Sequence, residues 1–96
     1  MIKHIVAWDF PEEGKKQNIR RMKNLLEELP GLIPEIMAYE IGVNIKDSEF
    51  AKDMILISVF KDVSALQTYS DHSEHQRVVQ ELRKVAKKTV VVDFET

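Results

Sequence analysis

The stretch from Asp53 to Asp62, with the sequence DMILISVFKD, constrains the fold more than any other part of the chain. We expect it to form a β-strand with apolar side chains on both faces. They are Met54, Leu56 and Phe60 on one face and Ile55, Ile57 and Val59 on the other. Such a strand normally lies in the middle of a sheet that helices cover on both sides. A chain of 96 residues is too short for two helical layers, so something outside the chain must cover the second face.

The residues before this stretch predict a strand, a helix and a second strand. Apolar and polar residues over Ile2–Asp9 fit a first strand, with His4 on the same face as Val6 and Trp8. From about Glu12 to Leu29 the apolar residues recur at helical spacing. The segment from Ile36 to Ile45 then fits a strand, and the polar residues 46–52 are long enough to join it to the following strand as a hairpin.

Two helices and a final strand are expected after the central stretch. Asp62 is a predicted N-cap for a short helix that carries Tyr69 on its apolar face. Ser73 with Gln76 three residues later has the form of a capping box, so a further helix is expected to begin there. Its inward stripe consists of His75, Val78, Val79, Leu82 and Val85 or Ala86. A β-branched run from Thr89 to Phe94 is the expected last strand.

This order, β-α-β-β-α-β, predicts a single α+β domain over residues 1–96 with a ferredoxin-like protomer. Its four-stranded antiparallel sheet would have helices on one face only. The other face is expected to collect the second apolar set of the central strand together with Val90, Val91 and Val92. An exposed apolar face of this size indicates an interface. We therefore expect a homodimer in which two open sheet faces pack together as a dimeric α+β barrel.

Composition excludes several classes of function. The 14 Lys and Arg against 16 Asp and Glu give a net charge of −2, which disfavours nucleic acid as the main partner. The absence of cysteine excludes disulfides, thiolate metal sites and a cysteine nucleophile. No signal-peptide core follows the N-terminus and no stretch is long enough to span a membrane, so we expect a cytoplasmic protein without a membrane partner.

The residues that could carry chemistry are His4, Tyr69 and the pair His72 and His75. Each has a simpler interpretation as a packing residue, and on the sequence alone we favour such a role for His4, which stands among apolar neighbours. Tyr69 continues the apolar stripe of its helix. His72 and His75 are three residues apart, a spacing at which two imidazoles can bind one metal ion. No third ligand accompanies them, so no metal site and no cofactor are expected.

The sharper hypothesis assigns His75 as a general base. It lies on the core-facing stripe, in the first turn of its helix, where the positive end of the helix dipole disfavours the imidazolium ion. Asp71 and Glu74 oppose this effect weakly. A neutral His75 that faces a cleft lined by His4 and Tyr69 is suited to accept a proton.

The order of several segments is specific when they are taken together. They are Ile2–Val6, the Pro30-Gly31 break, Glu40–Asn44, Asp53–Leu56, Phe60–Asp62, Ala65-Leu66, Tyr69, His72, His75 and Val91–Phe94. Over nearly the whole chain this order resembles the stress-responsive A/B barrel (Dabb) domain family within the dimeric α+β barrel superfamily. The resemblance implies a ferredoxin-like protomer and two sheets that face each other across a dimer.

One plant relative of that family is a polyketide cyclase that closes a ring by aldol chemistry without a cofactor. There a first-strand histidine, the second histidine of a His-x-x-His segment and a nearby tyrosine act at the site. The resemblance matches His4, His75 and Tyr69 to these positions. Ser73 replaces a proline of the cyclase-like segment, so the identity of the substrate does not carry over.

Three functions remain open on these grounds. The first is a homodimer that binds or transforms a small apolar or aromatic molecule in the helix–sheet cleft, with His75 as the base and His4 and Tyr69 orienting the ligand. The second is a stress-associated structural dimer in which the histidines only pack. The third is a monooxygenase that degrades haem or oxidises quinols, which topology alone suggests.

Overall fold

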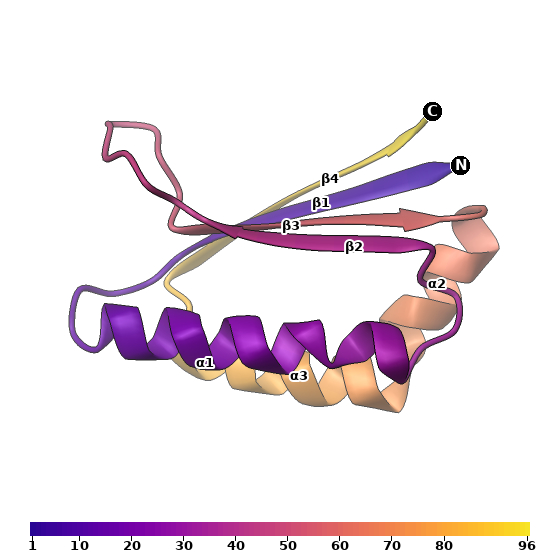
Figure 1. Ribbon diagram of the computed structural model, residues 1–96, viewed down its shortest axis with the longest axis horizontal. Coiled ribbons are helices and arrows are strands. Elements are labelled where there is room, and N and C mark those ends of the chain that lie inside the picture. The colour runs from indigo at the N-terminus through magenta and orange to yellow at the C-terminus, as the bar shows by residue number, and fades with distance from the viewer.

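The computed structural model describes all residues from Met1 to Thr96 and has two layers, an antiparallel sheet and helices on one of its faces (Figure 1). The strands lie in the order β2–β3–β1–β4. Along the chain the elements are β1 (Ile2–Asp9), α1 (Lys15–Glu27), a 3-10 turn (Leu29–Gly31), β2 (Ala38–Val43), β3 (Met54–Phe60), α2 (Val63–Asp71), α3 (Ser73–Val85) and β4 (Lys88–Glu95). This arrangement confirms the predicted α+β, ferredoxin-like fold.

The first helix is shorter than its apolar pattern predicts. It begins at Lys15 because the residue before it, Gly14, adopts the left-handed conformation with φ of 72° and ends the preceding turn. It ends at Glu27, and a 3-10 turn that contains Pro30 continues the chain. None of the helices is long and apolar enough to cross a membrane.

The junction between α2 and α3 places His75, and its cap differs from the prediction. Asp62 caps α2 as expected, since its carboxylate accepts a hydrogen bond of 2.8 Å from the Ala65 N–H. The predicted capping box at Ser73 is wrong: the cap of α3 is His72, whose Nδ1 accepts a hydrogen bond of 3.1 Å from the Glu74 N–H. An imidazole lone pair fills the role of the usual capping oxygen, and Ser73 becomes the first helical residue.

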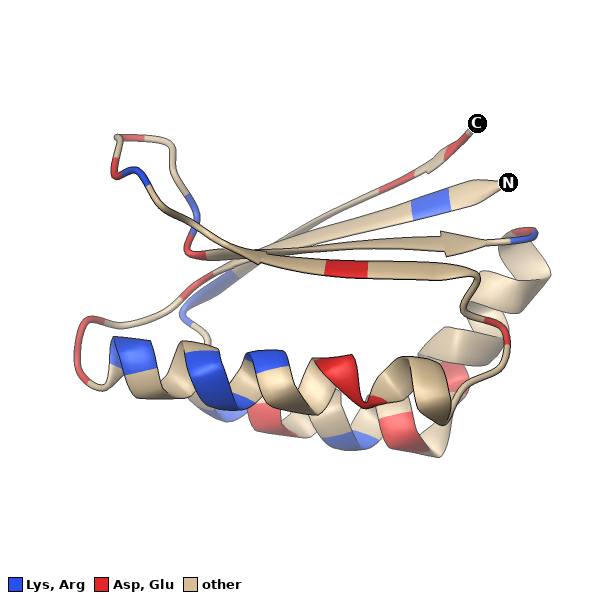
Figure 2. Cartoon of the chain, in the orientation of Figure 1, with Lys and Arg blue, Asp and Glu red and all other residues tan.

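The face of the sheet away from the helices, here called the open face, is mostly apolar, and the charged positions that the register places on it include Lys3 and Glu40 (Figure 2). The central strand β3 presents Ile55, Ile57 and Val59 there, as predicted. The register of β4 against β1 adds Val90, Val92 and Phe94, which are 40%, 60% and 43% exposed.

One residue assigned to the open face from the sequence lies on the other side of the sheet. Val91 is opposite Val6 in the register, and Val6 is buried under the helices. Directly opposed residues point to the same face of an antiparallel sheet, so Val91 faces the helical layer and the prediction for it was wrong.

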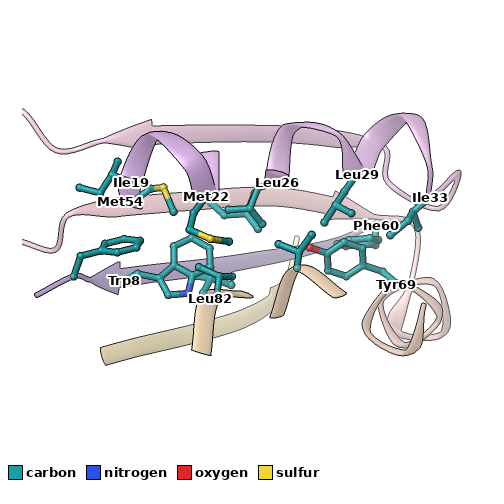
Figure 3. Packing of buried hydrophobic residues seen from close by; sticks show 14 of the residues in the cluster. Trp8, Ile19, Met22, Leu26, Leu29, Ile33, Met54, Phe60, Tyr69 and Leu82 are labelled. Atoms are coloured by element: carbon teal, nitrogen blue, oxygen red, sulfur yellow. The ribbon is translucent and has the colours of Figure 1, made fainter. Parts of the chain in front are cut away.

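The hydrophobic core fills the space between the sheet and the helices (Figure 3). From β3, Met54, Leu56 and Phe60 are at most 1% exposed, which confirms that this strand buries one face within the chain. The helices contribute Ile19, Met22 and Leu26 from α1 and Val78 and Leu82 from α3. Ser58 is the one buried polar residue, and its hydroxyl donates a hydrogen bond of 3.2 Å to the His4 carbonyl.

Candidate functional site

A cavity of about 470 Å³ opens between α3 and strands β1 and β4. It exists because the helices do not extend over the edge strand: all eight residues of β4 are exposed, including Val91 on the helix-facing side. Ten of the 16 residues that line the cavity are hydrophobic. A mainly apolar cavity with a few polar groups is the usual form of a small-molecule site.

The structure brings the three predicted site residues together in the wall of this cavity. His4 comes from β1, Tyr69 from α2 and His75 from α3. The Tyr69 ring is near both imidazoles: its centre lies 4.3 Å from that of His75 and 6.0 Å from that of His4. Tyr69 is itself fully buried, so the two histidines are the members of this group that a ligand can reach. His72 does not line the cavity.

The orientation of His75 is set by the end of α2. Its Nδ1 lies 3.1 Å from the Ser70 carbonyl oxygen, which also accepts a hydrogen bond of 2.6 Å from the Gln76 side chain. A carbonyl only accepts, so the neutral ring carries its proton on Nδ1 and leaves the lone pair of Nε2 free. Such an imidazole can take a proton from a ligand.

The charge state of His75 follows mainly from its burial. Burial lowers the pKa of His75, and repulsion from His4 and His72 adds to this effect, while the hydrogen bond to Ser70 opposes it. The sequence predicted the direction from the position of His75 in the first helical turn. Removal of the ring from water is the larger cause in the structure.

His4 has a carboxylate partner that the sequence analysis did not identify. Its Nδ1 hydrogen-bonds to Asp93, which lies directly opposite it in the β1–β4 register. The His4 side chain is 13% exposed and that of Asp93 is 43% exposed. Because the carboxylate accepts, the proton of His4 stays on Nδ1 and its Nε2 is the second polar atom. The available signal was the single carboxylate within the β-branched run, but its partner depends on the register.

A second tyrosine, Tyr39, is hydrogen-bonded to Tyr69. The hydroxyl of Tyr39, on β2, lies 3.1 Å from that of Tyr69. Burial raises the pKa of Tyr69 to about 12 and that of Tyr39 still further above its usual range. Both phenols are therefore neutral near pH 7, and neither is suited to act as a base there. Tyr39 faces the helices by alternation along β2, which is the signal that could have found it.

The spacing of His72 and His75 was compatible with a metal ion, although no metal site was predicted. His72 uses its Nδ1 to cap α3. No group of three or more His, Cys, Asp and Glu side chains is arranged to hold a metal ion.

The buried, neutral state of His75 generates a pH-dependent prediction. We expect the imidazole resonances of His75 to titrate below the ordinary value of about 6.5 in an NMR titration. As the pH falls below that value, the unfolded chain takes up a proton that folded His75 does not, so the free energy of unfolding decreases. His75→Gln removes this contribution, so denaturation curves of the variant should lose less stability between neutral and mildly acidic pH. A His75 that titrates at or above the ordinary value contradicts the assignment.

Comparison with known proteins places the chain in a family. It matches the Stress responsive A/B Barrel Domain over residues 2–96. An uncharacterised protein from Streptomyces coelicolor is 29% identical over 97 residues, which cover 99% of each chain. The crystal structure of a dimeric protein of unknown function with a ferredoxin-like fold, from Bacteroides fragilis, superimposes with a TM-score of 0.89 at 28% identity and covers 99% of this chain and 95% of that chain.

The same fold also occurs in a protein with a named activity. An antibiotic biosynthesis monooxygenase superimposes with a TM-score of 0.81, covering 100% of this chain and 98% of that chain at 21% identity. At that identity the likeness shows the shared fold alone. From the match over residues 2–96, the chain belongs to the stress-responsive A/B barrel (Dabb) domain family.

Proposed function

We propose that the protein is a homodimer in which each protomer binds a small apolar or aromatic molecule in the cavity between α3 and β4, and transforms it by acid–base chemistry without a cofactor. The observation that supports this most is the grouping of His4, Tyr69 and His75 in the wall of a mainly apolar cavity. Two imidazoles with fixed tautomers in such a wall are suited to proton transfer on a bound molecule.

In this proposal His75 is the base. Its Nε2 takes a proton from a carbon next to a carbonyl group of the ligand, and the ligand becomes an enolate. The resulting imidazolium keeps its Nδ1–H hydrogen bond to the Ser70 carbonyl, which stabilises the charge. The enolate carbon can then attack a second carbonyl, and the new alkoxide oxygen takes the proton back from His75. His4, held by Asp93, orients the carbonyl oxygens.

A structural role is the second candidate, and burial favours it. His4 is only 13% exposed and already hydrogen-bonded, and Tyr69 is fully buried with its hydroxyl beside that of Tyr39. In a purely structural dimer these side chains pack and position one another, and the cavity has no natural ligand. The two candidates differ in what happens when His75 loses its ability to accept a proton.

The homodimer is proposed from the open face. Besides its apolar strands, the connection between β2 and β3 rises on the same side of the sheet, away from the helices (Figure 1). It carries Ile45 and Phe50, which are 100% and 83% exposed. The related Bacteroides fragilis protein is described as dimeric. A second copy packed on this face would bury the exposed apolar residues of both sheets.

The base role of His75 is tested by exchange of the α-protons of an aromatic ketone, benzylacetone, in D₂O followed by NMR. We expect the wild-type protein to accelerate exchange and His75→Gln to lose at least about a hundredfold of that rate, since a positioned base contributes about 10²–10⁴-fold. His72→Asn is the matched control, because asparagine keeps a cap on α3 while an imidazole outside the cavity is removed. An unfolded His75→Gln variant, or unchanged exchange in it, supports the structural candidate.

The dimer is tested by light scattering coupled to size exclusion. The wild-type protein should elute with roughly twice the 11.2 kDa chain mass. Val92→Asp places a charge on the open face, halfway along strand β4, and should give a monomer, because a buried unpaired carboxylate opposes association. Val63→Asp is the control, since Val63 is 67% exposed at the start of α2 in the helical layer. A wild-type monomer, or a Val92→Asp dimer, contradicts the proposal.

A further inference from the structure

The cavity has a second end that the proposed chemistry does not use. His75, Val79 and Arg83 follow one another at intervals of four residues on α3, and all three line the cavity. At a rise of about 1.5 Å per residue, Arg83 lies about 12 Å along the helix from His75. Lys87, in the connection between α3 and β4, lines this same end. The cavity therefore runs from the imidazoles of His4 and His75 to a basic mouth.

The positive charge at this mouth is not neutralised within the chain. The other two cations of α3 have acidic partners: Arg77 pairs with Glu74 at 3.2 Å and Lys84 with Glu81 at 3.0 Å. Neither Arg83 nor Lys87 has a carboxylate within 4.0 Å, and both are exposed. Cations also stabilise the C-terminal end of a helix, but Lys84 supplies that effect from the same turn without lining the cavity.

A third basic residue at the mouth belongs to the other face of the sheet. Lys88 also lines the cavity, but the register sets it opposite Asp9, on the face of the sheet away from the helices. The Asp9 carboxylate lies 3.2 Å from the Lys52 amine. The charge that faces a ligand is therefore assigned to Arg83 and Lys87.

We propose that the natural ligand is an elongated apolar molecule with an anionic oxygen group, a carboxylate or a phosphate, that binds Arg83 and Lys87 at the mouth. Its apolar body lies between Val79 and Leu82 of α3 and Trp8 of β1, and its reactive end reaches His75. A guanidinium group fits the paired oxygens of a carboxylate or phosphate. This inference rests on the proposed function, since it names the class of ligand for the same site.

The fluorescence of Trp8, the single tryptophan, reports on ligands because Trp8 lines the cavity. The probes are phenylalkanoic acids of increasing chain length, the primary alcohols of the same lengths and the phosphate monoesters of those alcohols. We expect the anionic probes to bind more tightly than the alcohols and the difference to shrink as salt is added. Arg83→Gln should lower the affinity for the anionic probes about tenfold and leave the affinity for the alcohols unchanged.

Lys84→Gln is the matched control, because it removes the same charge from the same helical turn outside the cavity. The inference is overturned if Lys84→Gln lowers the affinity for the acids as much as Arg83→Gln does, or if acids and alcohols bind with equal affinity. In either case binding of the alcohols would leave the proposed function standing. If no probe binds at all, the inference and the proposed function fall together. Whether carboxylates or phosphates depend more on Arg83 identifies the source of the anionic group.

Discussion

A sheet that is apolar on both faces needs cover on both, and this chain has helices for only one. The two faces of β3 show the constraint directly: Met54, Leu56 and Phe60 are buried under the helices, whereas Ile55 on the other face is 37% exposed. The helical layer is also narrower than the sheet, so edge strand β4 stays exposed along its whole length. The open face exists because the helices cover only one side of the sheet, and the cavity exists because they do not extend over β4.

Within the cavity, burial controls which groups carry charge. His75 and the two tyrosines lie where a charge would be separated from water, so the imidazole pKa falls and the phenol pKa values rise. All three are neutral near pH 7. The permanent charges sit nearer to solvent, with Asp93 beside His4 and Arg83 at the far mouth. A ligand in such a cavity would meet two imidazoles along an apolar wall and a cation at its end.

The periodicity of the sequence was enough to predict the faces of the well-patterned elements. Alternation along β1 placed His4 beside Val6 and Trp8, and helical spacing placed His75 on the inner stripe of α3; the structure brings both to one cavity. The phase of β4 was not predictable in the same way. A run of three valines, 90–92, has no polar residue to mark its outer face, so only pairing with β1 shows that Val91 points inward.

Side-chain hydrogen bonds between distant elements could not be predicted from the sequence either. Asp93 meets His4, and Tyr39 meets Tyr69, through strand register and helix packing over long separations in the chain. The prediction for the cap of α3 failed for a local reason. Ser73 and Gln76 fit a common pattern, but the histidine one residue earlier has a ring nitrogen that accepts a hydrogen bond from the Glu74 N–H, so the cap lies one residue earlier.

The central claim is that the two faces of the sheet have separate roles, ligand binding on the helical side and self-association on the other. The most direct test is a titration of methyl-labelled protein with a phenylalkanoic acid, followed in methyl NMR spectra. The account predicts that Val78, Val79 and Val91 shift on binding, while Ile57, Val59 and Val92 do not. Shifts confined to Ile57, Val59 and Val92 would place the ligand on the open face and contradict the account.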